Sequence, residues 1–129
     1  MEEQNLILDF KINGQDLSCQ KPSFDLVENS VGYLKARFHF SEDWNGLYKI
    51  AVFQSQRETR AIHANEEDSQ SKDGTFFIPF NVIKTPGFRV SCIGTDVKLA
   101  LDENNRYLDP RINRRITTDP IMISLKGSG

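Results

Sequence analysis

The sequence predicts an all-β fold, an antiparallel β-sandwich or small barrel of about eight or nine short strands with little helix. Apolar and polar residues alternate with period two in several segments, as in strands that are buried on one face. Turn-forming residues recur about every 8–12 positions, and extended stretches with the 3.6-residue spacing of a helix are absent. The 129 residues are expected to form one domain at 1–126, with a flexible tail at 127–129.

The first strand is predicted at Leu6–Ile12 and turns at Asn13-Gly14 into a second strand at Leu17–Gln20. A polar loop is expected at 64–74 and a charged loop at 102–115. A single helical turn is expected at Asn81–Lys84. Further strands are predicted, in chain order, at Arg60–His63, Thr75–Phe80, Phe88–Ile93, Val97–Leu101, Ile116–Thr118 and Ile121–Leu125. Proline within Thr75–Phe80 places that strand at a sheet edge or strand end, because proline cannot donate a ladder hydrogen bond.

A central hairpin is predicted from Val31–Phe40 and Leu47–Gln54, joined by a short polar turn. In the first of these strands, apolar residues alternate with Tyr, Lys, Arg and His, which gives one core face and one polar face. Asn45-Gly46 favours a tight turn, because this pair tolerates positive φ angles. Trp44, the single tryptophan, precedes it. We expect Trp44 to close one end of the core, with an exposed stacking platform for a ligand as the alternative.

The charge balance excludes some classes of function. Lys and Arg number 16 against 18 Asp and Glu, for a net charge of −2, which does not fit a general nucleic-acid binder. The start of the chain lacks the features of a secretion signal, and apolar runs fall short of the roughly 18 residues of a membrane helix. We therefore expect neither nucleic acid nor membrane as a partner.

Reactive constellations are not evident in the sequence. His39 and His63 lack a second ligand at zinc spacing, and the acidic run 66–73 lacks the order of a calcium loop. Cys92 falls on a core position and is expected to be a buried free thiol, with a Cys19–Cys92 disulfide as the alternative. A carboxylate pair such as Glu42 and Asp73 is not singled out by any pattern. No enzymatic activity, metal or cofactor is expected.

One loop is a candidate contact surface for another protein. It combines arginines with a tyrosine, residues that suit bidentate pairing and rigid apolar contact at interfaces. The alternative is a solvated loop neutralised by its own acidic residues. The candidate partner-binding residues are Arg106, Tyr107, Arg111, Arg114 and Arg115. The acidic run 66–73 is a possible electrostatic complement, either between copies or toward a neighbour.

Three segments taken together resemble small β-rich structural proteins of phages and prophages of Gram-positive bacteria. They are Phe40–Phe53 (FSEDWNGLYKIAVF), Ile78–Gly94 (IPFNVIKTPGFRVSCIG) and Arg115–Gly129 (RITTDPIMISLKGSG). In those proteins such a domain often stands at the N-terminus of baseplate or tail-fibre proteins. The resemblance implies a virion-associated, non-enzymatic attachment domain, located in the virion or in the bacterial host cytoplasm.

The resemblance implies other phage structural proteins, or copies of the same chain, as partners. Two alternatives remain open at this point. One is a phage-encoded inhibitor of a host defence system, which would bind a host protein or a signalling ligand. The other is a carbohydrate-binding module that uses Trp44 and Tyr107.

Overall fold

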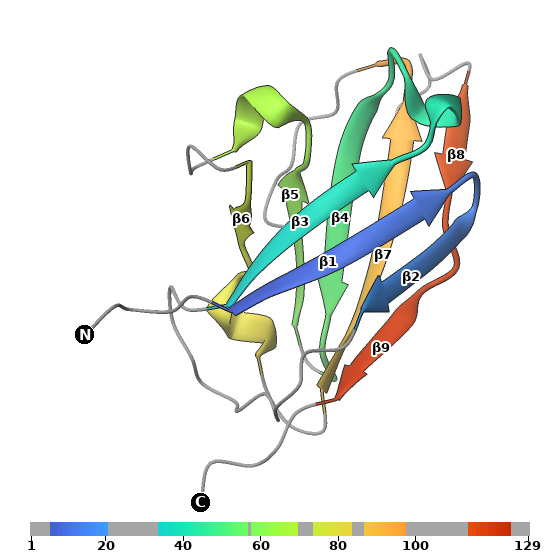
Figure 1. Ribbon diagram of the computed structural model, residues 1–129. Coiled ribbons are helices and arrows are strands. Elements are labelled where there is room, and N and C mark those ends of the chain that lie inside the picture. The colour runs from blue at the N-terminus through green and yellow to red at the C-terminus, as the bar shows by residue number, and fades with distance from the viewer. Residues whose placement is uncertain are drawn as a thin grey trace, which may run out of the picture.

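The computed structural model describes residues 6–20, 34–56, 58–69, 74–83, 87–97 and 114–124. Within these ranges the chain forms nine strands in two facing sheets, which confirms the predicted small all-β sandwich (Figure 1). Helical structure in these ranges is confined to three short 3-10 turns: η1 (Glu42–Trp44), η2 (Glu66–Asp68) and η3 (Phe80–Val82). The helical turn expected near residue 81 is η3, and η2 lies in the predicted polar loop.

The first sheet has the strand order β2-β1-β3-β6. Its strands are β1 (Leu6–Asn13), β2 (Asp16–Gln20), β3 (Leu34–Phe40) and β6 (Phe76–Phe77). The predicted β1–β2 hairpin is confirmed, and β6 lies at a sheet edge as the nearby proline indicated. β1 and β3 run parallel, with Phe10 opposite Phe38, so this pair departs from the antiparallel expectation.

The second sheet has the order β5-β4-β7-β8, and β9 also pairs with β7. Its strands are β4 (Tyr48–Gln54), β5 (Thr59–His63), β7 (Gly87–Thr95), β8 (Arg115–Thr117) and β9 (Ile121–Ser124). β8 pairs with the end of β7 and β9 with its beginning. Thr118 bridges the interruption: its amide donates to the Cys92 carbonyl over 3.0 Å, and its hydroxyl accepts from the Cys92 amide over 2.9 Å. Of the strand predicted at Val97–Leu101, Val97 lies in a bend and the remainder lies outside the described residues.

The predicted central hairpin is wrong, because β3 and β4 belong to different sheets. The connection is a turn in which Asn45 has φ −62° and ψ 134°, Gly46 has φ 80°, and the Leu47 amide donates to the Trp44 carbonyl over 3.2 Å. These angles define a type II turn, whereas a two-residue type I′ hairpin requires positive φ at both central residues. The chain therefore crosses from one sheet to the other at this point.

The main core fills the space between the two sheets. It includes Leu8 and Phe10 from β1, Phe53 from β4, and Phe88 and Val90 from β7, each at most 1% exposed. Phe10 stacks on Phe38 across the parallel pair, with ring centroids 5.4 Å apart. Side chains of both sheets thus interdigitate as in other aligned sandwiches.

Trp44 closes one end of this core and is fully buried. Its indole Nε1 donates to the Gly14 carbonyl over 2.9 Å, and its ring lies 5.0 Å from the ring of Phe40. A β-carbon added to Gly94 would stand 2.7 Å from the indole, so only glycine leaves room for the ring there. The structural prediction for Trp44 is confirmed, and the alternative of an exposed stacking platform is wrong because the indole has no accessible face.

We predict that Trp44→Ala lowers the free energy of unfolding by about 3–5 kcal/mol, the range for emptying a large aromatic site. Trp44→Phe, which keeps an aromatic ring but loses the hydrogen bond to Gly14, should cost less. Gly94→Ala should also destabilise, since its methyl group meets the indole. Urea unfolding of the three variants measures these differences. A midpoint for Trp44→Ala equal to that of the unaltered chain would contradict the assignment.

Candidate protein-contact face

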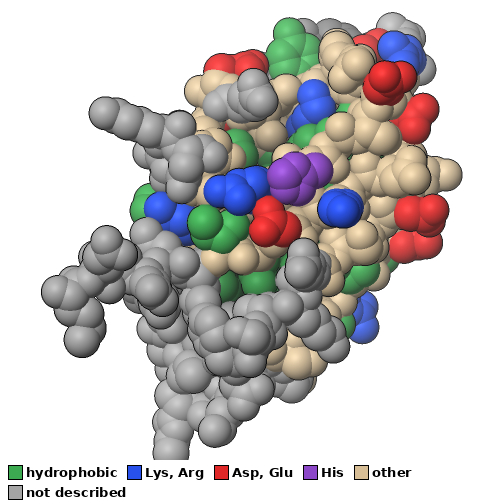
Figure 2. All heavy atoms as spheres, in the orientation of Figure 1, with side chains coloured by type: hydrophobic (Ala, Val, Ile, Leu, Met, Phe, Trp, Pro, Cys, Tyr) green, Lys and Arg blue, Asp and Glu red, His purple; other side chains and the backbone are tan. Residues whose placement is uncertain are grey.

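The outer face of the four-stranded sheet is the best-defined charged surface among the described residues. The strand alternation that buries Leu8, Phe10 and Ile12 turns the residues between them outward. We define the outer face by the outward side chains of three strands: Asp9 and Lys11 of β1; Lys35, Arg37 and His39 of β3; and Phe77 of β6. Figure 2 views this face directly and shows blue side chains around a histidine near its centre.

Asp9 lies between two potential cations. Its Oδ1 is 3.1 Å from Nε2 of His39 and 3.6 Å from a terminal nitrogen of Arg37. The parallel register places Asp9 opposite Arg37 and Lys11 opposite His39, so four charged or titratable groups occupy two adjacent rows. These side chains are 36–51% exposed, so water screens the pairs and each contributes no more than about 1 kcal/mol to stability. Their arrangement orients the side chains rather than stabilising the fold.

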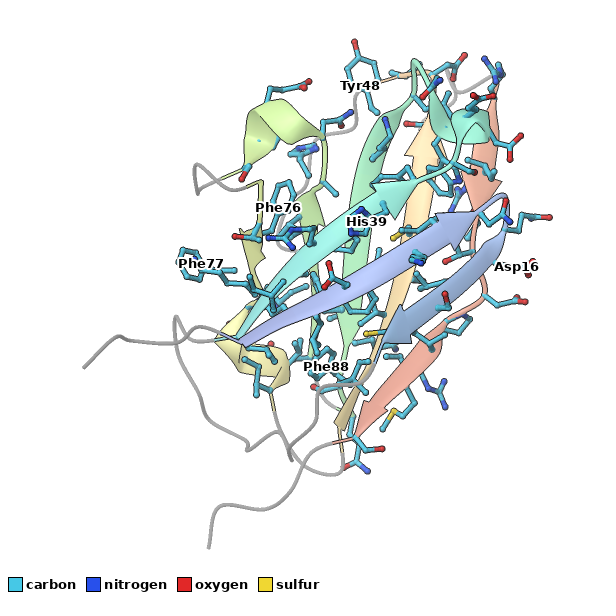
Figure 3. All side chains as sticks on the ribbon, viewed as in Figure 1. Asp16, His39, Tyr48, Phe76, Phe77 and Phe88 are labelled. Carbon is cyan, nitrogen blue, oxygen red and sulfur yellow. The ribbon has the colours of Figure 1, made fainter. Side chains whose placement is uncertain are left out.

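An aromatic side chain borders this cluster at the sheet edge. Phe77 is 37% exposed, and Nζ of Lys35 lies 4.9 Å from its ring centroid (Figure 3). Its neighbour Phe76 is buried in the core. Lys35 itself is buried, so its ammonium group lies against the Phe77 ring while the ring stays partly exposed at the sheet edge. Exposed aromatic side chains are enriched at protein interfaces.

A shallow hollow of about 360 Å³ lies where the parallel strands β1 and β3 end. It is lined by Lys11, Ile12, Asn13, His39, Phe40 and Ser41. The Ser41 hydroxyl accepts a hydrogen bond from the Gly14 amide over 3.0 Å and donates one to Asp43 over 3.3 Å. The hollow is too open to enclose a small molecule. A side chain that projects from another protein could occupy it.

The sequence-predicted contact residues fall in two groups. Arg106, Tyr107 and Arg111 lie outside the described residues. Arg114 and Arg115 are exposed at the start of β8, in the other sheet from the outer face.

The described part of the arginine loop is tied to β7. The Arg114 amide donates to the Asp96 carboxylate over 3.2 Å, and the Asp96 amide donates to the Arg114 carbonyl over 3.3 Å. Nε of Arg115 donates to the Thr117 hydroxyl over 3.4 Å. The loop therefore returns to the sheet at a fixed position, and its role in binding stays a prediction.

The sequence reasoning did not propose the outer face as a site. The polar alternation of β3 was visible in the sequence, and His39 is exposed as its position indicated. What the sequence did not supply is the parallel pairing that brings Asp9 beside Arg37 and His39. That pairing depends on strand order across the whole domain.

Metal-ligating groups and thiols are two kinds of reactive group that the described ranges could supply. They contain no group of three or more His, Cys, Asp or Glu side chains placed to hold a metal ion. Both cysteines are free thiols, Cys92 buried as predicted and Cys19 partly buried. Burial raises the pKa of Cys92 from 9.0 to about 12; burial, and secondarily the charge of Asp9, raise the pKa of Cys19 to about 11. Neither thiol is a ready nucleophile at neutral pH.

No protein-family model matches this sequence, and neither curated proteins nor solved structures include a significant match to it. No helix among the described residues has the length and apolar character needed to cross a membrane.

We predict that Cys92 resists iodoacetamide in the native protein and reacts after denaturation, as read by intact mass. The unfolded thiol ionises near pH 9 and the folded thiol near pH 12. The protonated Cys92 thiol therefore makes its full contribution to the free energy of unfolding below pH 9. That contribution is lost as the pH rises toward 12, by up to about 1.4 kcal/mol per pH unit. Urea unfolding at about pH 8 and about pH 10 measures this loss. Cys92→Ala should reduce the decline, and rapid alkylation of native Cys92 would contradict the assignment.

Proposed function

We propose that this chain is a phage or prophage virion-associated structural protein, a tail or baseplate attachment domain that acts by protein–protein contact. We place the contact on the outer face of the four-stranded sheet. The observation that carries this choice is the pair of Arg37 and His39 held at fixed strand positions around the Asp9 carboxylate, with the partly exposed Phe77 at the edge of the same sheet. Its place of work is the virion or the cytoplasm of the bacterial host.

Rigid presentation supports a binding role for this face. β1 and β3 are anchored by core side chains such as Phe10 and Ala36, both fully buried, so the residues between them have little backbone freedom to lose on binding. Arg37 and Phe77 supply the arginine and aromatic contacts that dominate many interfaces, and the exposed charges around them favour one partner over others. A flat, open face of this kind fits another protein better than a small substrate.

The assignment to phage structural proteins draws on the resemblance of three separate segments, and these segments meet in space. A β-carbon on Gly94, from the second segment, would lie 2.7 Å from Trp44 of the first and 2.9 Å from Ile116 of the third. The three segments that carry the resemblance therefore pack against one another in the folded domain. This supports a shared domain type, and with it the attachment role.

The carbohydrate-binding alternative loses its main support, because it required an exposed Trp44. Tyr107, its other residue, lies outside the described residues. A phage-encoded inhibitor would also act through a protein surface, and tail genes or early genes beside the coding sequence would separate it from a structural component.

We predict that Arg37→Glu combined with Phe77→Ser removes the protein from phage particles without unfolding it. Both side chains are partly exposed on the outer face, so the change in stability should stay within about 0.5–1 kcal/mol. The measurement is co-sedimentation of the protein with particles purified from an induced culture that carries each variant. Thermal melts establish that the fold survives.

Arg89→Glu is the matched control, because Arg89 is exposed on β7 of the other sheet. It should co-sediment normally. A second variant, Arg114→Glu with Arg115→Glu, examines the arginine loop. Undiminished co-sedimentation of the Arg37/Phe77 variant would remove the outer face from consideration, and selective loss in the Arg114/Arg115 variant would transfer the contact to the loop.

A further inference from the structure

Charges are segregated along the outer face. Its middle carries a basic band of Lys11, Arg37 and His39 around the single carboxylate of Asp9. One end carries an acidic rim, which we define as Asp16, Glu42 and Asp43, all exposed. Figure 2 shows the basic side chains across the centre and acidic ones along the right-hand rim, and Figure 3 places His39 and Asp16 in these two regions.

The segregation follows from the parallel pairing of β1 and β3. Because the two strands end at the same edge of the sheet, the β1–β2 turn and η1 lie side by side there. Asp16 is opposite Asn13, and Asp43 accepts from Ser41. The shallow hollow overlaps the basic band at Lys11 and His39 and extends along the strands to Asn13 and Ser41, and Asn13 is opposite Asp16 of the acidic rim.

Several of these charges have no counter-ion in the part of the chain that the structure describes. In the described ranges, Lys11, Asp16 and Glu42 make no ion pair. Asp43 is hydrogen-bonded to a neutral hydroxyl. Unpaired charges of both signs on one surface can be neutralised by a partner that carries the opposite arrangement.

We infer that a second copy of this chain binds to the outer face, face to face, about a two-fold axis through the hollow. This inference rests on the proposed protein-contact function of the same face. A two-fold rotation about the boundary between two oppositely charged halves brings each half onto the opposite half of the other copy, so the surface is complementary to itself. A residue near the axis meets its own copy, so the axis passes the end of the hollow that the neutral Asn13 and Ser41 line, and Lys11 and His39 lie on its basic side.

The size of the face sets the expected strength of the dimer. The strands β1, β2, β3 and β6 hold 8, 5, 7 and 2 residues, and at about 4.8 Å by about 3.3 Å per residue they give a sheet face of roughly 350 Å². A stable interface buries about 800 Å² per partner, so the sheet and the acidic rim together give a weak dimer. Since its charged side chains are partly exposed and the dimer is weak, salt should dissociate it as the screening length falls from about 10 Å at 0.1 M to about 3 Å at 1 M.

The decisive experiment exchanges the charges of the two halves. The first variant is Lys11→Glu with Arg37→Glu, and the second is Asp16→Lys with Glu42→Lys. Sedimentation equilibrium of the unaltered chain should show a dimer that grows with protein concentration and dissociates in 1 M salt. Each variant alone should be monomeric, because like charges now face each other. An equimolar mixture of the two should restore the dimer.

Several outcomes would overturn the inference. They are an unaltered chain that stays monomeric at low salt, variants that dimerise alone as well as the unaltered chain does, or a mixture that does not associate. If a charge-reversed variant fails to melt cooperatively, a single neutralising substitution takes its place. Lys11→Gln replaces the first variant and Asp16→Asn the second, and each of these substitutions must weaken the dimer. A monomer that still co-sediments with particles through this face would overturn the self-association alone and leave the proposed function standing. A dimer that never co-sediments with phage particles would overturn the proposed function and leave the self-association standing.

Discussion

The burial of one indole ring between two backbone segments is the constraint on which the sandwich depends. Trp44 sits on the connection between β3 and β4, donates to the Gly14 carbonyl of the β1–β2 turn, and packs against Gly94 of β7. It therefore joins a turn of the first sheet, a strand of the second and the link between them. Three parts of the chain far apart in sequence must be in place before the indole is enclosed, which makes this end of the core cooperative.

The same end of the molecule determines what the surface presents. Because β1 and β3 are parallel, their carboxyl ends meet at the edge that Trp44 closes, and the exposed residues of η1 project beside the β1–β2 turn. The basic side chains of the outer face then lie within β1 and β3, whereas the acidic rim lies at the start of β2 (Asp16) and on η1 (Glu42 and Asp43). The charge pattern of the face is thus a consequence of strand direction, and a different pairing of the same strands would distribute these charges differently.

Local patterns in the sequence predicted the elements well and their connections less well. Period-two alternation identified β3 and β7, because a half-buried strand imposes that period on its residues, and β-rich composition beside a turn signal identified β1. Asn45-Gly46 indicated a turn, but the pair is compatible with more than one turn type, and only the φ of Asn45 distinguishes a crossing from a hairpin. The burial of Trp44 followed from its size and setting. The cluster of Asp9, Arg37 and His39 could not be predicted, since it requires a parallel register between strands separated by β2 and a further connection.

The interruption between β8 and β9 bears on a different property, the behaviour of the chain when many copies are crowded together. A continuous strand along β7 would leave a straight row of backbone donors and acceptors at the sheet edge, the template from which intermolecular β-sheet grows. Here the Thr118 hydroxyl stands in for a backbone acceptor, and Pro120, which has no amide proton, follows two residues later. The edge is divided into two short strands, and the register of pairing with β7 shifts by one residue between them. We expect this interruption to hinder edge-to-edge pairing between copies, independently of surface charge.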